Sequence, residues 1–392
     1  MELEQTVRRM NGGIADRKKA YAEGRVREIL ESRYDVGRVG GVTELFGGEV
    51  NRNYEAVTIL AGEERRWFVR QYEPGRKIEE ILYEYHLLIH LRERTFDQAP
   101  LPVAAKDGAE CVRYPFGDEE HWFMVYEFLP GENTYQWERN NVSHKALESA
   151  VRLLARFHTA AADYRPEAGW KVREPVIREQ LAGYGANIKR NYDHIKALGV
   201  REKDGSNDIF TRYLDSKEAF LSEALPGISK IFDHEDKLFK TVVHTDPHPG
   251  NFKYSDDKAV GLFDFDWVKE DVRLYDLAIG AMFFCSSWEG RNNGEADLSM
   301  LELFLRSYDN EIMKHKSGVP PVTDCEKEAF ARMMAAGSLY VVNFSLNRCY
   351  NEEDMNLFLS FYYVQHQMSC AEWAIENEEL IVDTVRKYKE GV

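Results

Sequence analysis

The fold is decided by one stretch of the chain, which reads Val242-Val243-His244-Thr245-Asp246-Pro247-His248-Pro249-Gly250-Asn251-Phe252. In this stretch the end of an apolar strand is followed by a loop that contains two prolines and a glycine. A second apolar strand is predicted at Val260–Trp267, and Ser255–Lys258 has the composition of a turn before it. The resulting hairpin is predicted to bring Asp246, Asn251 and Asp264 together at one of its ends.

These three polar side chains suit phosphoryl transfer. The reaction needs a carboxylate that orients the attacking hydroxyl and accepts its proton, and hard oxygen ligands that hold Mg²⁺ on the nucleotide phosphates. Asp246 suits the base, Asn251 suits one metal position, and Asp264 would bridge magnesium to the phosphates. Asp and Asn are also common turn residues, but this combination of residues at this spacing is much rarer than a turn.

One motif carries a resemblance to a known family, and it reads His244-x-Asp246-x-His248-Pro249-x-Asn251. Together with the strand that ends in Asp264, it resembles the aminoglycoside phosphotransferase and choline kinase group, which includes homoserine kinase-like members. The resemblance covers about residues 42–284. It implies an α+β, bilobal protein-kinase-like fold, with a small antiparallel-sheet N-lobe carrying one helix and a larger, mainly helical C-lobe. Thr245 and Pro247 depart from the family, where a glycine and a larger residue are more frequent.

The resemblance implies a small-molecule kinase that uses ATP and Mg²⁺, and two alternatives remain open beside it. A pseudokinase would bind nucleotide without turnover. A metal-dependent hydrolase would use His244, Asp246 and His248 as ligands, since His-x-Asp-x-His has ligand-like chemistry. Prolines interleave these three residues, however, and no further histidine cluster lies near. His248 is therefore predicted to pack in the loop, and His244 to pin the loop backbone.

A glycine-bearing turn lies upstream, between two short β-prone runs at residues 42–45 and 54–60. In the resembled families a Gly-Gly-x-x-Asn turn opens the N-lobe over the nucleotide phosphates. This resemblance assigns Gly47, Gly48 and Asn51 to nucleotide binding.

A cation on the next strand should reach the phosphates, and Arg70 stands at that place. Protein kinases use lysine there, whereas the resembled small-molecule kinases often tolerate arginine, which binds phosphate bidentately. A glutamate on the helix predicted over 78–94 should hold this cation. Glu84 lies in the middle of that helix, while its rivals Glu79 and Glu80 lie near the start, where acidic residues stabilise the helix dipole.

A hinge between the lobes is predicted at Val125–Gly131. The backbone around Glu127 would bind the adenine edge, and Leu129 would line the adenine pocket. The predicted division is a nucleotide-binding lobe over residues 1–130, with a helical extension over 1–38, and a catalytic and substrate-binding lobe over 131–392. Later helices are predicted at about 277–284, 301–314, 325–346 and 357–375.

The chain after Asp264 is too short for a peptide-docking platform, because only 12 positions separate it from Asp276 (276 − 264). Asp276 is predicted to cap the following helix, and in the resembled families an aspartate here also braces the catalytic loop. The substrate is therefore predicted to be a small hydroxyl compound: an amino alcohol, a hydroxy-amino acid, a sugar or an aminoglycoside. Candidate substrate-binding residues are Asp266, Trp267, Tyr340, Asn343, Arg348 and Glu372. Acidic and aromatic groups would suit an amine, and Arg348 would suit a carboxylate.

The composition excludes several other classes of protein. The formal net charge is −16, from 51 basic and 67 acidic residues, which disfavours nucleic acid as a partner. The five cysteines are scattered and form no C-x-x-C pair, as is typical of a reducing compartment. The notable apolar run Leu277–Cys285 has nine residues, whereas a membrane span needs about 20. We expect a cytoplasmic protein without a membrane partner; the sequence leaves its oligomeric state open.

Overall fold

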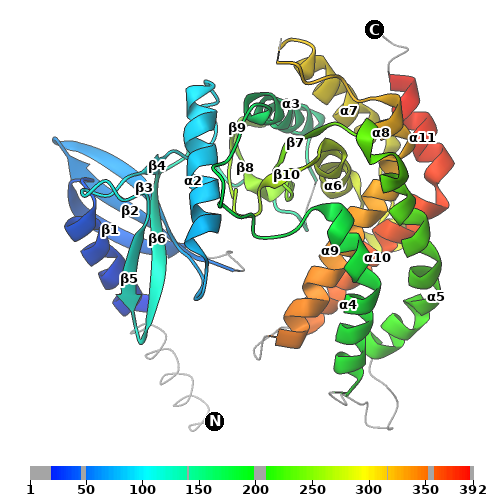
Figure 1. The fold of residues 1–392 in the computed structure, drawn as a ribbon, viewed down its shortest axis with the longest axis horizontal. Coiled ribbons are helices and arrows are strands. Elements are labelled where there is room, and N and C mark those ends of the chain that lie inside the picture. The colour runs from blue at the N-terminus through cyan, green and yellow to red at the C-terminus, as the bar shows by residue number, and fades with distance from the viewer. Residues whose placement is uncertain are drawn as a thin grey trace. The chain divides into compact units, whose positions relative to one another are not determined.

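The chain forms two compact units in its computed structural model (Figure 1). The first contains residues 1–130 and 165–172, and the second contains residues 131–164 and 173–392. The structure describes residues 19–45, 50–138, 141–197, 209–315, 317–351 and 357–388. The predicted glycine turn at Gly47 and Gly48 lies outside the described residues.

The first unit is built on an antiparallel sheet. Its elements are a helix over residues 19–33, then β1 (Arg38–Leu45), β2 (Arg52–Leu60), β3 (Glu63–Gln71), α2 (Ile78–Glu93), β4 (Pro102–Val103), β5 (Val112–Phe116) and β6 (Glu119–Glu127). The strands are ordered β1-β2-β3-β6-β4, and β5 pairs with β6. The strands β1 and β2 contain the β-prone runs predicted at residues 42–45 and 54–60, and α2 matches the helix predicted over 78–94.

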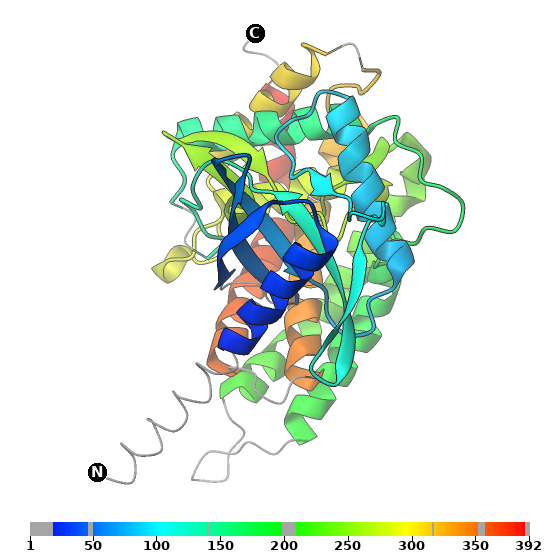
Figure 2. The ribbon, with the colours of Figure 1, turned by 90° about the vertical axis from the view of Figure 1, so that its left-hand side faces the viewer.

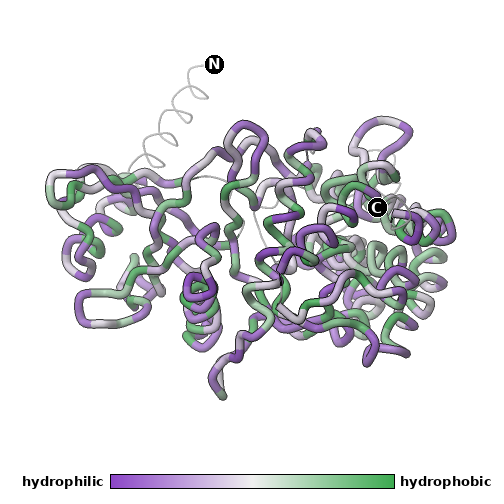
Figure 3. The backbone as a smooth tube through the Cα atoms, turned by 90° about the horizontal axis from the view of Figure 1, so that it is seen from above, coloured by the Kyte–Doolittle hydropathy of each residue, from purple (hydrophilic) through white to green (hydrophobic). Residues whose placement is uncertain are grey.

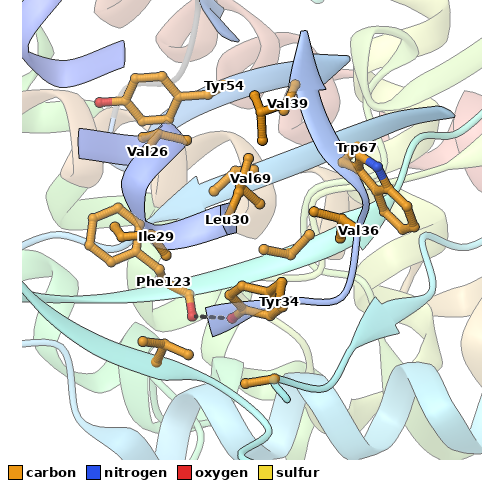
Figure 4. Close-up of a cluster of buried hydrophobic side chains, with 14 of the residues drawn as sticks. Val26, Ile29, Leu30, Tyr34, Val36, Val39, Tyr54, Trp67, Val69 and Phe123 are labelled. Carbon is orange, nitrogen blue, oxygen red and sulfur yellow. Dashed lines mark hydrogen bonds between the residues drawn. The ribbon is translucent and has the colours of Figure 1, made fainter. Parts of the chain in front are cut away.

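The two faces of this sheet carry different chemistry. Val69 and Val125 lie on the face that the helix over residues 19–33 covers, where Val26 and Ile29 pack into the same apolar cluster (Figures 2 and 4). Because side chains alternate along a strand, Arg70, next to Val69 on β3, points to the opposite face. The buried Glu84 of α2 meets it there. The helix on one face thus stabilises the sheet, while the other face carries polar groups.

The second unit is mainly helical. Its helices are α3 (His144–Ala161), α4 (Ile177–Ala197), α5 (Ile209–Ser229), α6 (Arg273–Cys285), α7 (Leu298–Ile312), α8 (Asp324–Glu328), α9 (Phe330–Asn351), α10 (Leu357–Glu376) and α11 (Glu378–Lys387). The short 3₁₀ helices are η1 (Lys230–Lys237), η2 (Pro249–Asn251) and η3 (Gly290–Asn292). Its strands are β7 (Lys240–Val243), β8 (Phe252–Ser255), β9 (Lys258–Leu262) and β10 (Lys269–Val272).

Helix α6 is buried along its whole length. This explains the apolar run that the sequence contains at Leu277–Cys285, because a helix surrounded by other helices needs no polar face. Elsewhere apolar and polar residues alternate over short distances along the backbone (Figure 3). Within the described part of the chain, no helix combines the length and apolar character that a membrane span requires.

The predicted hairpin needs a correction. The strand β7, which was predicted to belong to it, pairs with β10, while the hairpin joins β8 to β9. Its turn residues Asp256 and Asp257 have φ of 50° and 58°, the left-handed conformation of the turns that join two strands tightly. The predicted strand Val260–Trp267 is also too long, because β9 ends at Leu262. Asp264 therefore lies in the loop after the strand.

Two predicted helix boundaries were wrong as well. Asp276 does not cap α6, because this helix begins three residues earlier and its N-cap is Val272. The helix predicted over 325–346 is divided at Ala329 into α8 and α9. The sequence interpretation assigned no bounds to α4, α5 and α11.

Candidate active site

The loop between β7 and β8 places Asp246 beside Asn251. The Asn251 side-chain amide Nδ2 donates hydrogen bonds to the Asp246 carbonyl, at 2.8 Å, and to its carboxylate Oδ2, at 3.2 Å. The backbone N–H of Phe263 donates to the Asn251 carbonyl at 3.0 Å. This last bond ties the segment that carries Asp264 to the loop that carries the other two predicted residues.

Asp276 holds the start of this loop from inside the second unit. Its carboxylate is fully buried and accepts the backbone N–H of His244 at 2.6 Å and that of Thr245 at 2.7 Å. Nε2 of His158, on α3, lies 3.0 Å from the same carboxylate. The sequence interpretation did not include His158 in the site, because its partner is 118 positions away. Carboxylates that accept several buried N–H groups hold backbone strongly.

Two residues of the site have left-handed backbones, Thr245 with φ of 72° and Asp264 with φ of 69°. This conformation is strained for residues other than glycine and tends to occur at functional sites. The Thr245 hydroxyl donates to the Trp267 carbonyl at 3.3 Å, which helps to hold the turn. The conformation also explains why glycine suits this position in the resembled families.

His244 anchors the loop to the segment before Asp264. Its Nε2 lies 2.9 Å from the carbonyl of Phe263, to which it donates. Burial lowers the pKa of His244, so its ring is neutral at physiological pH and serves as a hydrogen-bond donor.

The carboxylate of Asp246 has an unusually high proton affinity. Burial of the carboxylate by the surrounding groups raises its pKa to about 7, although 36% of the Asp246 side chain is exposed to solvent. His244 and the Asn251 amide oppose this rise, and the negative charge of Asp264 adds to it. A cation bound by nearby oxygen atoms would lower the pKa of Asp246 again. A carboxylate whose pKa is raised toward neutral pH is suited to accepting a proton.

His248 is held within the loop. Its Nδ1 accepts the backbone N–H of Gly250 at 3.0 Å, and its ring packs edge-on against Phe283. Its Nε2 is 3.5 Å from the Asp246 carboxylate. Among the residues that the structure describes, no three His, Cys, Asp or Glu side chains converge as a metal cluster.

In the first unit, Arg70 and Glu84 form a buried ion pair with 3.3 Å between Nη1 and Oε1. Two tyrosines that the sequence interpretation missed complete the arrangement. Tyr126 donates to Oε1 of Glu84 and Tyr72 donates to its Oε2, each at 2.9 Å. The rival predicted partners Glu79 and Glu80 lie in the first turn of α2. The Glu79 carbonyl accepts a backbone N–H of Lys171, and the Glu80 carboxylate pairs with Arg76 at 3.0 Å.

The other predicted nucleotide-binding residues have modest contacts. The buried Asn51 accepts the backbone N–H of Glu73 at 3.2 Å through its side-chain oxygen. Glu127 ends β6 with an exposed side chain, and its N–H donates to the Leu101 carbonyl at 2.8 Å. Leu129 is half-buried.

The predicted substrate residues Asp266 and Trp267 both contact Arg173, which the sequence interpretation missed. Nη1 of Arg173 lies 2.6 Å from the buried carboxylate of Asp266. The guanidinium carbon lies 3.8 Å from the centre of the Trp267 ring. No short-range pattern in the sequence could have found this residue, since 93 positions separate it from Asp266.

The remaining predicted substrate residues come from α9 and α10. The Tyr340 hydroxyl donates to Glu174 at 3.0 Å. Its pKa is raised well above the usual value by burial first and then by Glu174, with Asp246 also contributing. The Arg348 guanidinium lies 5.9 Å from the ring of Phe344.

Glu372 and Asn343 differ in whether their side-chain oxygens already have hydrogen-bond partners. The Glu372 carboxylate is bound by Lys217, with both of its oxygens 2.8 Å from Nζ. Oδ1 of Asn343 is buried without a hydrogen-bond partner among the described residues. Of these two, Asn343 retains an acceptor that a ligand could use.

The antiparallel sheet with α2, the mainly helical second unit and the constellation of Asp246, Asn251 and Asp264 define a protein-kinase-like fold of the small-molecule kinase type. Solved structures of other proteins share this fold. A microcompartment-associated aminopropanol kinase matches with a TM-score of 0.63 at 15% identity, covering 91% of this chain and 98% of that one. A spectinomycin phosphotransferase bound to ADP and spectinomycin matches with a TM-score of 0.60 at 15% identity, covering 94% and 98%.

Residues 41–300 match the phosphotransferase enzyme family, and the chain belongs to it. A homoserine kinase of Rhodospirillum rubrum is 27% identical over 319 residues, covering 81% of this chain and 83% of that protein. A homoserine kinase of Brucella ovis is 23% identical over 361 residues, covering 88% and 94%. The chain is therefore a small-molecule kinase, an enzyme that transfers a phosphoryl group to the hydroxyl of a small molecule.

Proposed function

We propose that the chain transfers the γ-phosphate of ATP, as its Mg²⁺ complex, to the hydroxyl of a small amino-bearing alcohol, with Asp246 as the proton acceptor. The observation that carries this proposal is the bond from the Asn251 amide to the Asp246 carboxylate, on a loop that Asp276 fixes. A fixed carboxylate of raised pKa can orient a hydroxyl and accept its proton as the phosphoryl group arrives.

Asn251 and Asp264 are the residues that would hold magnesium. The Asn251 amide nitrogen is engaged by Asp246, which leaves its oxygen as the atom suited to a cation. Together with the Asp264 carboxylate this makes a set of hard oxygen donors, the kind that Mg²⁺ prefers. When bound, the metal would neutralise charge on the phosphates.

The nucleotide would be bound by the first unit. Arg70, oriented by Glu84, would contact the α- and β-phosphates, and Asn51 with Gly47 and Gly48 would cover them. The backbone at Glu127 and the side chain of Leu129 would hold the adenine. The buried ion pair of Arg70 supports this assignment, because a guanidinium fixed by a carboxylate is ordered before the phosphates bind.

The relatives favour a small amino-bearing alcohol as the substrate. Eight similar proteins are named homoserine kinases, and one similar structure is an aminopropanol kinase. Homoserine and aminopropanol are both short alcohols with an amino group. The strongly acidic chain is compatible with a substrate that carries a positive charge.

The test is release of ADP from Mg-ATP across a panel of amino alcohols, hydroxy-amino acids, sugars and aminoglycosides. Asp246→Asn should lower kcat about 10²- to 10⁴-fold with at least one panel compound, while ATP binding is retained. Asp193→Asn, which changes an exposed residue paired with Lys189, is the matched control and should retain full activity.

Other outcomes would point elsewhere. Tight ATP binding without turnover on any panel compound would favour the pseudokinase alternative. Absence of ATP binding would refute the proposed function.

A further inference from the structure

The guanidinium of Arg173 is held by two neighbouring side chains, as in a ligand-binding site, and is not a solvated surface charge. It stacks 3.8 Å above the centre of the Trp267 ring, and its Nη1 lies 2.6 Å from the Asp266 carboxylate. The side chain of Asp266 is 2% exposed and that of Arg173 is 14% exposed. The buried carboxylate and the indole thus hold the guanidinium in place at a position where the Arg173 side chain reaches the surface.

This group lies next to the residues of phosphoryl transfer. Asp266 follows Asp264 by two positions, and the Trp267 carbonyl accepts the hydroxyl of Thr245, the residue before Asp246. The Trp267 ring is 6.1 Å from that of Phe344, which is 6.4 Å from that of Tyr340. Arg173 therefore contacts Asp266 and Trp267, on the segment that also carries Asp264 and holds the turn before Asp246.

Several acidic residues lie near Arg173, so its positive charge bears on which substrates can bind there. Asp246, Asp264, Asp266 and Glu174 all carry carboxylates, and together they would repel an anionic substrate. A planar guanidinium is the side chain best matched to a carboxylate, because it can donate two parallel hydrogen bonds. One oriented arginine among four acids would thus allow a carboxylate to bind at one defined place.

We propose that Arg173, oriented by Asp266 and Trp267, binds the carboxylate of a hydroxy-amino acid substrate and so selects hydroxy-amino acids over the corresponding amino alcohols. This inference rests on the proposed function and adds a substrate class and a specificity-determining residue to it. It assigns to Arg173 the carboxylate-binding role that the sequence analysis gave to Arg348, whose guanidinium lies 5.9 Å from the Phe344 ring.

The test uses pairs of compounds that differ only in the carboxylate: L-homoserine and 3-amino-1-propanol, L-threonine and 1-amino-2-propanol, and L-serine and ethanolamine. The wild-type enzyme should prefer the acid of at least one pair by kcat/KM. In Arg173→Gln, KM for that acid should rise about 10- to 100-fold. KM for the matched amino alcohol and KM for ATP should change less than about threefold.

Four variants accompany this measurement. Arg173→Lys keeps the charge but loses the bidentate geometry and should recover only part of the preference. Because Arg173→Gln removes the cation beside the buried Asp266 carboxylate and can unfold the chain, the double variant with Asp266→Asn provides a folded protein that lacks both charges. Arg348→Gln tests the rival arginine. Arg178→Gln, which changes an exposed arginine that pairs with Glu235, is the matched control and should behave as wild type.

The outcomes separate the two proposals. Turnover of amino alcohols without any preference for the acids would overturn the role of Arg173 and leave the proposed function intact. A preference that survives in both the Arg173→Gln and the double variant, or that is lost only in Arg348→Gln, would also overturn it. Failure of every pair to be phosphorylated would refute the proposed substrate class, and the role of Arg173 with it.

Discussion

Replacing Asp276 by asparagine is expected to lower both the stability of the chain and the rate of phosphoryl transfer. The two carboxylate oxygens accept the backbone N–H groups of His244 and Thr245 at 2.6 and 2.7 Å. Asparagine offers one oxygen in place of two, so one of these buried N–H groups loses its acceptor. A buried donor without a partner costs about 1–3 kcal/mol, and we expect the free energy of unfolding to fall by that amount.

The effect on catalysis follows from the position of the loop. The Asp276 carboxylate holds the two residues that directly precede Asp246, so a lost bond allows the proposed base to shift. A displacement of about 1 Å at a reacting group costs about 100-fold in rate. We therefore expect kcat to fall between about 10- and 100-fold, with KM for ATP nearly unchanged, because the nucleotide is bound mainly by other residues.

The measurement combines urea unfolding with steady-state kinetics on the preferred panel compound. Asp309→Asn is the matched control. Asp309 is also buried, and its carboxylate accepts the backbone N–H of Val322 at 2.7 Å and the hydroxyl of Tyr388 at 2.6 Å. Asp309→Asn should lose similar stability yet keep its kcat per folded molecule. If Asp276→Asn lost stability and still retained full kcat, the carboxylate would not position the loop.

Two further predictions concern buried groups away from the loop. Tyr126→Phe removes a 2.9 Å hydrogen bond to Glu84 and should raise KM for ATP about 3- to 10-fold through weaker orientation of Arg70, measured by varying ATP; an unchanged KM would show that the tyrosine has no such role. Burial lowers the pKa of His366 to about 3, so below about pH 6.5 the unfolded chain takes up a proton that the folded chain does not. Stability should therefore fall as the pH falls, by about 2 kcal/mol between pH 7 and pH 5, and urea titrations of His366→Gln should show a smaller loss.

The proximity of Asp246 and Asn251 could be predicted because these residues are close together in the sequence. Asp246 and Asn251 are five positions apart, and the turns and prolines between them restrict the backbone locally. Asp264 follows two residues after the end of the β8–β9 hairpin, whose first strand begins directly after Asn251. The partner of Arg70 could be chosen as well, since its position in the middle of a helix distinguishes Glu84 from the acids of the first turn.

The supporting contacts could not be predicted because they are distant in sequence. His158 and Arg173 reach the site from segments that lie 118 and 93 positions away from their partners. The pairing of β7 with β10 involves four-residue strands, and strands this short carry too little hydrophobic pattern to specify their partner. Tyr72 and Tyr126 could not be assigned to Glu84 before the register of the sheet was known.

The departure of Thr245 from the family pattern shows how the loop and its supports depend on one another. A left-handed backbone costs a residue with a Cβ about 1–2 kcal/mol, which glycine avoids. Threonine offsets part of this cost through its hydroxyl, which donates to the Trp267 carbonyl, and the N–H bond to Asp276 stabilises the same turn. The ring of Trp267 also packs against the guanidinium of Arg173. Thr245 therefore connects the loop that carries Asp246, the proposed base, to Arg173, the proposed carboxylate-binding residue. A glycine at this position would satisfy the backbone but could not make that connection.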